Sequence, residues 1–170
     1  MEPWLNFLHR MKNATKTVRI GLVGKYVELP DAYKSINESL FQAATYNDRK
    51  LDLQYIHSEK LNSGNVDAML SSLDGVLIAP GFGQRGIEGK FIALKYAREH
   101  DIPTFGVCLG MQCMVIEYAR DVLGYTDANS TEMDVTTKHN VIDLMEEQKS
   151  ITNMAVSYTH LRAHETELHL

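Results

Sequence analysis

The sequence predicts an α/β fold with a doubly wound, mostly parallel sheet. Apolar segments typical of strands alternate with segments of helical periodicity along the chain. The run at residues 73–79 is apolar almost throughout, as parallel strands covered on both faces are. A third observation is a glycine-flanked cysteine, Cys108, at the passage from a strand to a helix. Functional groups of such folds gather at the carboxyl ends of the strands.

The first half of the chain contains two expected helices and two expected strands. Residues 2–11 form a short amphipathic helix, and residues 18–23 form the first strand. Asp31 is the expected N-cap of the next helix. The apolar face of this helix is expected to comprise Ile36, Leu40, Phe41 and Ala44. Residues 51–57 alternate like a half-buried strand.

The second half repeats the strand and helix alternation around the cysteine. Residues 73–79 form a fully buried strand, and a helix covers about 86–100. A further strand at 102–107 delivers Cys108, and a helix at 109–120 follows at once. We expect the strand that carries the cysteine to be central in the sheet, with the catalytic groups at its carboxyl end.

Composition limits the class of protein. The chain has 170 residues, of which 44% are hydrophobic and 23% charged, enough for the core of one domain. A net charge of −5 gives no electrostatic footprint for nucleic acid or an anionic membrane. The apolar runs fall short of the roughly 20 residues that a membrane-spanning helix needs. Cys108 and Cys113 are spaced poorly for a disulfide framework or a metal site, which indicates a reducing compartment, the cytoplasm.

The segment Gly106-Val-Cys-Leu-Gly110 has the layout of a nucleophile elbow. Its glycines allow a tight turn that points the Cys108 side chain out of the sheet, and the N-terminus of the following helix favours the thiolate. Among the side chains available at neutral pH, a thiolate is the strong nucleophile. The alternative is a buried structural cysteine at a strand-to-helix junction. Cys113, inside the helix, is expected to be a small core residue.

A glycine-rich loop, Ala79-Pro-Gly-Phe-Gly-Gln-Arg-Gly86, follows the buried strand. In an acyl-transfer site, one backbone donor from such a loop and one from the residue after the nucleophile hold a tetrahedral oxyanion. The N–H groups of Gly81 and Leu109 are the candidates. An ordinary loop between a strand and a helix is the alternative, and phosphate binding is disfavoured because the Walker lysine is absent.

Four strings carry a resemblance to a known family. Pro80-Gly-Phe-Gly-Gln-Arg-Gly86, Gly106-Val-Cys-Leu-Gly-Met-Gln112 and Asn129-Ser-Thr-Glu132 resemble class I glutamine amidotransferases. Val23-Gly-Lys-Tyr-Val-Glu-Leu-Pro-Asp-Ala-Tyr-Lys-Ser35 resembles specifically the amidotransferase half of the CTP synthase family. The likeness covers about residues 1–154. It implies a flavodoxin-like class I glutamine amidotransferase fold, truncated at the C-terminus.

The resemblance also implies an activity. Members of the family are two-site ligases in pyrimidine biosynthesis. One domain hydrolyses glutamine to glutamate and ammonia. A synthase domain, absent from this chain, uses ATP and Mg²⁺ to convert UTP to CTP with that ammonia, and GTP acts as an activator. Full-length members are homotetramers, and no cofactor is expected in the present chain itself.

The same resemblance assigns roles to residues. Cys108 is implied to be the nucleophile that forms a glutamyl thioester, and Arg85 lies in the segment that members use near the activating GTP. The carboxylate of Glu132 suits the α-ammonium group of the substrate. The implied glutamine-binding residues are Gly81, Leu109, Gly110, Met111, Gln112 and Glu132.

The expected domain organisation has three parts. Residues 1–16 match the linker from the synthase domain, and residues 17–154 form a partial amidotransferase domain. Residues 155–170 no longer resemble the family and are expected to be a non-native tail, similar to translated adapter read-through. The His-x-Glu pair that completes the family's triad would lie beyond residue 153. We therefore expect the polypeptide alone to be at best a crippled glutaminase with one open face or edge of the sheet.

The histidines present do not supply the missing base. His9, His57, His100 and His139 lack the expected spacing, and those of the tail are not expected to reach Cys108 in working geometry. Two other classes stay open: a cysteine hydrolase or chaperone-like protein of the related flavodoxin-like superfamily, and a non-catalytic fragment. Labelling of the cysteine by a glutamine analogue, with protection by glutamine, would discriminate between them.

Overall fold

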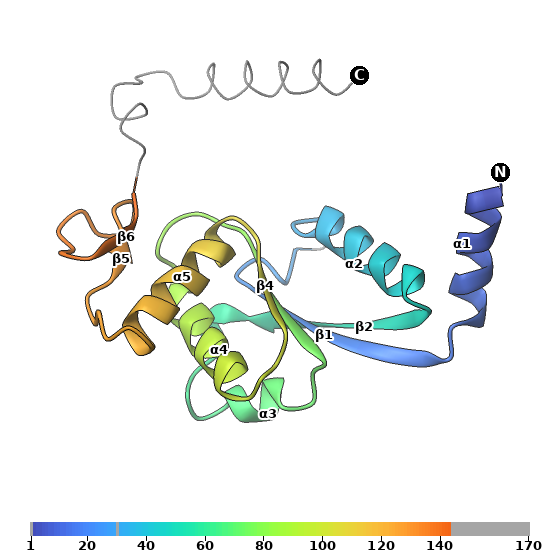
Figure 1. The fold of residues 1–170 in the computed structure, drawn as a ribbon, viewed down its shortest axis with the longest axis horizontal. Coiled ribbons are helices and arrows are strands. Elements are labelled where there is room, and N and C mark those ends of the chain that lie inside the picture. Colours follow the sequence, from blue (N-terminus) through green and yellow to red (C-terminus); the bar gives the residue numbers. More distant parts are fainter. Residues whose placement is uncertain (1, 30, 144–170) are drawn as a thin grey trace, which may run out of the picture.

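The computed structural model describes residues 2–29 and 31–143. Its main sheet has four parallel strands in the order β2-β1-β3-β4. Figure 1 shows this sheet crossing the middle of the molecule with helices on both sides. The strands are β1 (Lys16–Gly24), β2 (Arg49–His57), β3 (Gly75–Ile78) and β4 (Thr104–Gly106). The predicted parallel α/β architecture is confirmed.

Helices connect the strands, and a small second sheet follows them. The helices are α1 (Glu2–Asn13), α2 (Lys34–Tyr46), the 3₁₀ helix η1 (Ser58–Lys60), α3 (Val66–Leu70), α4 (Ile87–Glu99) and α5 (Leu109–Asp121). The two short strands β5 (Asn129–Ser130) and β6 (Asn140–Ile142) pair in parallel. Each helix and strand expected up to residue 120 is present, with bounds shifted by a few residues.

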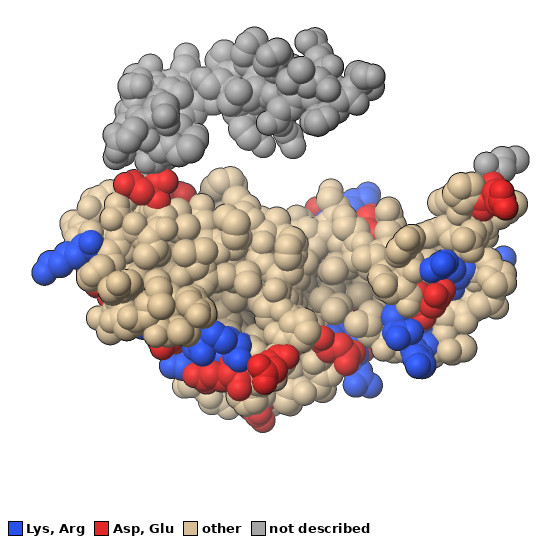
Figure 2. Space-filling view, in the orientation of Figure 1, with Lys and Arg blue, Asp and Glu red and all other residues tan. Residues whose placement is uncertain are grey.

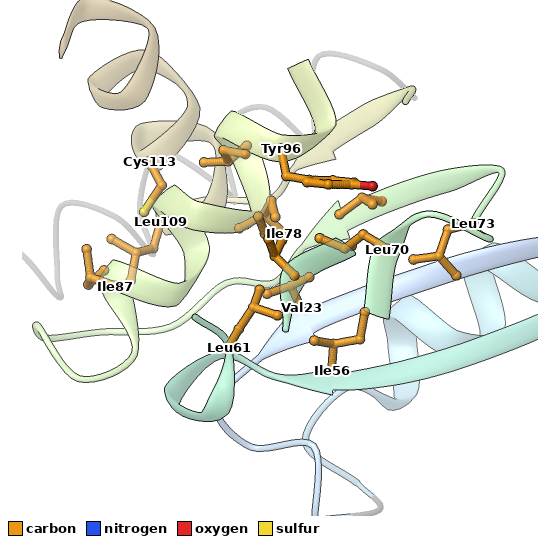
Figure 3. Close-up of a cluster of buried hydrophobic side chains, with 14 residues drawn as sticks. Val23, Ile56, Leu61, Leu70, Leu73, Ile78, Ile87, Tyr96, Leu109 and Cys113 are labelled. Carbon is orange, nitrogen blue, oxygen red and sulfur yellow. The ribbon is translucent and has the colours of Figure 1, made fainter. Parts of the chain in front are cut away.

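Alternating residues of the central strands build two cores. Val23 of β1 and Ile78 of β3 point into the cluster formed with α3, α4 and α5, as Figure 3 shows. Leu22 and Leu77, one position away on the same strands, point into the second cluster, which α2 covers. Because strand side chains alternate between faces, helices on both faces make these strands apolar throughout. The sheet is therefore doubly wound.

The expected central position of the cysteine strand is wrong for the described residues. Here β1 and β3 are the inner strands, and β4 lies at the end of the sheet, paired with β3 alone. Chain order does not give sheet order, because β1 pairs with both β2 and β3 and pushes β4 outwards. Phe105, in the middle of β4, keeps 66% of its surface exposed and lines an open groove with Leu40 of α2.

Two details of α2 also differ from expectation. Asp31 is not the N-cap: its carbonyl accepts the Lys34 N–H at 3.4 Å in a preceding turn, and Tyr33 occupies the cap position without a side-chain bond. Burial of the Tyr33 ring against β1 fixes this start. Phe41 leaves the core face and meets Phe7 of α1 edge-on, with ring centroids 6.4 Å apart.

Charges of both signs are dispersed over the surface. In Figure 2 they gather along the edge formed by α3 and α4 and near α1, whereas the middle of this face carries few. Within the described ranges, no helix is both long and apolar enough to cross a membrane. The expected tail at 155–170 lies outside the described residues, and the domain boundaries stay predictions.

Candidate active site

The elbow places Cys108 at the N-terminus of α5, directly after β4. Its φ of 53° and ψ of −114° lie in a region that residues with a side chain rarely adopt, and such strain typically costs about 1–3 kcal/mol. Two bonds close the turn: the Gly110 N–H donates to the Val107 carbonyl at 2.8 Å, and the Gln112 N–H donates to the Cys108 carbonyl at 3.1 Å. The thiol is exposed. A strained, exposed cysteine at a helix start has the geometry of a nucleophile.

The two flanking glycines are required by close backbone contacts. A Cβ atom on Gly106 would lie 2.5 Å from the Met111 nitrogen, and one on Gly110 would lie 2.1 Å from the Ile78 carbonyl oxygen. Both neighbours are main-chain atoms, which cannot swing away. The first turn of α5 thus lies directly against β4 on one side and β3 on the other, and this fixes the direction of the Cys108 side chain.

The glycine-rich loop reaches the elbow because β3 and β4 are neighbours. A Cβ atom on Gly81 would lie 3.9 Å from the Leu109 side chain, so the two predicted donor residues are close together. The Leu109 N–H is the first of α5 and has no acceptor within the helix. The structure therefore brings the cysteine and both candidate residues together, while their oxyanion role stays a prediction.

The remaining predicted residues of the motif lie on the first turn of α5. Gly110 is buried, Met111 is exposed and Gln112 is half-buried. The Gln112 Oε1 atom is buried and has no hydrogen-bond partner within the described part of the chain. An unpaired buried acceptor is costly and suits an atom that awaits a donor.

Glu132 is exposed on the segment between β5 and β6. Its N–H donates to the Ser130 hydroxyl at 3.1 Å. The Gln84 side chain donates to the Met133 carbonyl at 2.7 Å, which ties this segment to the glycine-rich loop. Arg120 donates to a main-chain carbonyl of the same region at 2.6 Å. The segment that carries Glu132, a predicted glutamine-binding residue, is thus bonded to the glycine-rich loop and to the last turn of α5.

A carboxylate fastens the base of the Glu132 segment. The Asp127 side chain bonds the His139 ring at 2.6 Å and accepts the Lys138 N–H at 3.2 Å. The hydrogen bond with His139 lowers the pKa of Asp127 below its usual range. The His139 ring also stacks on Tyr125, with centroids 4.6 Å apart. With these contacts, the Asp127–His139 pair forms a local clasp.

Arg85 lies at the outer part of the glycine-rich loop. Its side chain is 61% exposed, and its Nε atom is 3.1 Å from a Glu59 carboxylate oxygen. The guanidinium also lies over the Tyr26 ring, 5.7 Å from the centroid. The residue is held by an ion pair and a ring, and its predicted role near GTP is untested.

Three of the described histidines have partners other than Cys108. His57 caps the 3₁₀ helix after β2, His100 stacks on an aromatic ring of α4, and His139 belongs to the clasp. Within residues 2–29 and 31–143, no hydrogen bond joins a histidine to the elbow thiol. The same ranges contain no group of three or more His, Cys, Asp or Glu side chains that could hold a metal ion. The tail histidines lie outside the described residues.

The second cysteine is structural, as expected. Cys113 is fully buried within the cluster of Figure 3. Burial raises the pKa of its thiol to about 11, and the positive charges of Lys90 and Arg120 oppose that shift. A thiol with so high a pKa is protonated at neutral pH and is a poor nucleophile.

Sequence reasoning missed two buried lysines beneath the glycine-rich loop. Lys90 of α4 is 1% exposed and donates to the Ala79 carbonyl at 2.7 Å. Lys25, directly after β1, is 8% exposed and donates to the Phe82 carbonyl. For Lys90 a sequence clue existed, because it falls on the apolar stripe of its helix, three residues after Ile87.

Comparison with known sequences identifies the family. The model of the family described as glutamine amidotransferase class-I matches residues 28–169. The chain belongs to this family. The matched region contains the glycine-rich loop, the elbow and the Glu132 segment of this amidotransferase.

Several curated CTP synthases are relatives of the amidotransferase. It is 70% identical over 152 residues to CTP synthase of Bacteroides fragilis. This aligned region covers 89% of this chain and 28% of the relative. Identity to CTP synthase of Porphyromonas gingivalis is 62% over 157 residues, covering 92% of this chain and 29% of the relative. The chain therefore corresponds to the glutamine amidotransferase domain of these enzymes and spans between a quarter and a third of their length.

A solved structure supports the fold of the amidotransferase. The amidotransferase is similar to the glutaminase domain of the Trypanosoma brucei enzyme CTPS with bound acivicin, with a TM-score of 0.71 and 40% sequence identity. The match covers 78% of this chain and 52% of that one. The α/β fold with a parallel sheet and the family assignment are thus supported by sequence and structure.

Proposed function

We propose that this chain is the glutamine-hydrolysing part of a CTP synthase, with Cys108 as its nucleophile. The observation that supports this most directly is the elbow: an exposed thiol on a strained residue, locked by two glycines, beside Gly81 and Leu109. The CTP synthase relatives, at up to 70% identity, indicate the substrate class.

In the proposed reaction, the Cys108 sulfur attacks the side-chain amide carbon of glutamine. An S–C bond forms, and the carbonyl electron pair becomes an oxyanion that accepts hydrogen bonds from the N–H groups of Gly81 and Leu109. The C–N bond then breaks, the nitrogen takes the proton that the thiol gave up on attack, and ammonia leaves. Water attacks the resulting glutamyl thioester, which releases glutamate and restores the thiol.

The substrate's other groups would meet the remaining predicted residues. The exposed carboxylate of Glu132 would hold the α-ammonium group, and Gln112 has an unpaired buried oxygen for a further donor. Gly110 and Met111 would border the substrate from the first turn of α5. Each of these roles is part of the proposal.

We further propose that the chain alone hydrolyses glutamine slowly. A general base must lie within about 2.6–3.2 Å of the proton it takes, and no described histidine bonds the thiol. Loss of a triad partner typically costs about 10³-fold or more in turnover, while oxyanion donors leave residual catalysis.

The ammonia would serve the ATP-dependent conversion of UTP to CTP. The described residues offer no cluster of acidic side chains for Mg²⁺ and no Walker lysine, so they do not fit this step. We assign it to the part of CTP synthases that the matched region does not cover. We also propose a GTP effector site at Arg85 and assembly into tetramers with the rest of the enzyme. The proposed location is the cytoplasm, which the free state of both cysteines supports.

The test is covalent labelling, because it needs no turnover. The purified chain is treated with a diazo-ketone analogue of glutamine and the modified residue is found by peptide mass spectrometry. We expect one adduct at Cys108 and none in Cys108→Ser. Millimolar glutamine should slow its formation, whereas 2-aminoadipate, which is glutamate with one more methylene group, should not. Labelling that glutamine does not slow would favour a general cysteine hydrolase, and absence of labelling a non-catalytic fragment.

A further inference from the structure

Two buried ammonium groups hold the glycine-rich loop from the side of the core. Lys90 bonds the carbonyl of Ala79, and Lys25 bonds the carbonyl of Phe82. These carbonyls lie on either side of Gly81. The loop is therefore fastened at both ends of the short segment that would present the Gly81 N–H to an oxyanion.

Neither lysine has a carboxylate partner in the described ranges, where the ion pairs involve other residues. Burying an ammonium group without a counter-ion is costly, and such groups are concentrated at functional sites. Burial lowers the pKa of Lys90, and the positive charge of Lys25 lowers it further, whereas a thiolate at either cysteine would oppose that shift. Its bond to the Ala79 carbonyl places the Lys90 ammonium two residues along the loop from Gly81.

The stem of Lys25 also contacts the loop directly. A Cβ atom on Gly81 would lie 3.5 Å from the Lys25 Cε atom and 3.9 Å from the Leu109 side chain. Gly81 therefore fits between the lysine stem and the start of α5. Movement of Lys25 would release the loop on the side opposite the elbow.

We propose that Lys25 and Lys90 are positioning residues for the glutaminase reaction, holding Gly81 so that its N–H meets the oxyanion formed on Cys108. This inference rests on the proposed function. The lysines act through the loop and do not touch the substrate.

The test compares two reagents on the same thiol. Lys25→Met and Lys90→Met keep most of the side-chain volume and remove the donor, and Lys95→Met on α4, half exposed and paired with Asp121 at 3.4 Å, is the matched control. For the full chain we measure the second-order rate of Cys108 labelling by the diazo-ketone analogue and by iodoacetamide. We expect each buried-lysine variant to lose about tenfold with the analogue, because displaced oxyanion donors lower reactivity. The iodoacetamide rate should change by less than about twofold, and the control should change in neither.

A second measurement does not depend on the reaction. Amide hydrogen exchange at residues 80–83 should be faster in both variants than in the parent chain, with exchange in β1 and β3 unchanged. Lys25→Arg retains a donor and should restore at least about half of the analogue rate if the bond to the loop is what matters. If Lys25→Met does not fold, Lys90→Met and Lys25→Arg carry the test.

The outcomes separate the two proposals. No labelling of the parent chain by the analogue overturns the proposed function and, with it, the role of the lysines in that reaction. Labelling of the parent chain with unchanged analogue rates and unchanged loop exchange in the variants overturns this inference alone. Equal losses with both reagents also overturn it, since they show general damage to the elbow instead of a loss of positioning.

Discussion

Replacing Gly110 by alanine tests whether the elbow is held by backbone packing. The added Cβ atom would lie 2.1 Å from the Ile78 carbonyl oxygen and 2.8 Å from its carbon, whereas real Cβ contacts stay beyond 3.0 Å. Ile78 cannot yield, because it belongs to an inner strand and its carbonyl already accepts the Val107 N–H at 3.1 Å. The start of α5 must therefore move by nearly 1 Å.

The size of the effect follows from three terms. Overpacking costs about 1–3 kcal/mol, and weakening the Val107 bond costs about 1 kcal/mol more. The higher helix propensity of alanine offsets about 1 kcal/mol. We expect Gly110→Ala to lose about 1–3 kcal/mol of unfolding free energy. A displacement of about 1 Å at the nucleophile should lower the labelling rate with the glutamine analogue by about 10²-fold.

Urea unfolding followed by far-UV circular dichroism measures the first quantity, and peptide mass spectrometry of Cys108 measures the second. Gly64→Ala is the control, because its Cβ atom would meet only the end of the Asn62 side chain, at 3.2 Å. It should leave both quantities close to those of the parent chain. An unchanged unfolding midpoint together with an unchanged labelling rate in Gly110→Ala would refute the packing argument.

Further predictions concern the core thiol, an ion pair and the clasp. Cys113, with a pKa of about 11, should resist iodoacetamide in the native chain at neutral pH and react after denaturation; native alkylation there would contradict its burial. Glu117→Gln should cost about 1–3 kcal/mol in urea unfolding, because Arg98 loses a bidentate partner that is 5% exposed, while a change near zero would show that the pair is dispensable. The lowered pKa of Asp127 means that its bond with His139 stabilises the fold above the ordinary carboxyl pKa and is lost as pH falls through the lowered value. The difference in melting temperature between the parent chain and Asp127→Asn should therefore be present at pH 7 and vanish towards strongly acidic pH, and a difference independent of pH would exclude this linkage.

The elements were predictable because their periodicity is local. The full burial of β3 followed from its apolar sequence, and the elbow followed from two glycines around a cysteine. Sheet order was not predictable, since the position of β4 depends on which strands pair with β1 across long stretches of chain. Asp31 failed as a cap because burial of the Tyr33 ring, a tertiary contact, decides where α2 begins.

The sequence predicted those site residues that would act through main-chain groups within a recognisable motif. The meeting of Gly81 with Leu109 follows from the neighbouring positions of β3 and β4. Lys25 and Lys90 were missed because a lysine in a sequence usually belongs to the surface, and only the packed fold shows both donating to one loop.

The contact between Gly110 and Ile78 has a consequence for how the thiol can be used as a probe. Ile78 pairs through β3 with both β1 and β4, so the turn at Cys108 exists only in molecules whose parallel sheet has assembled. An unfolded chain still has the thiol but not the backbone arrangement around it. Under the proposed function, the fraction of Cys108 that the glutamine analogue modifies at saturation would count the correctly folded molecules in a preparation, which total thiol titration cannot do.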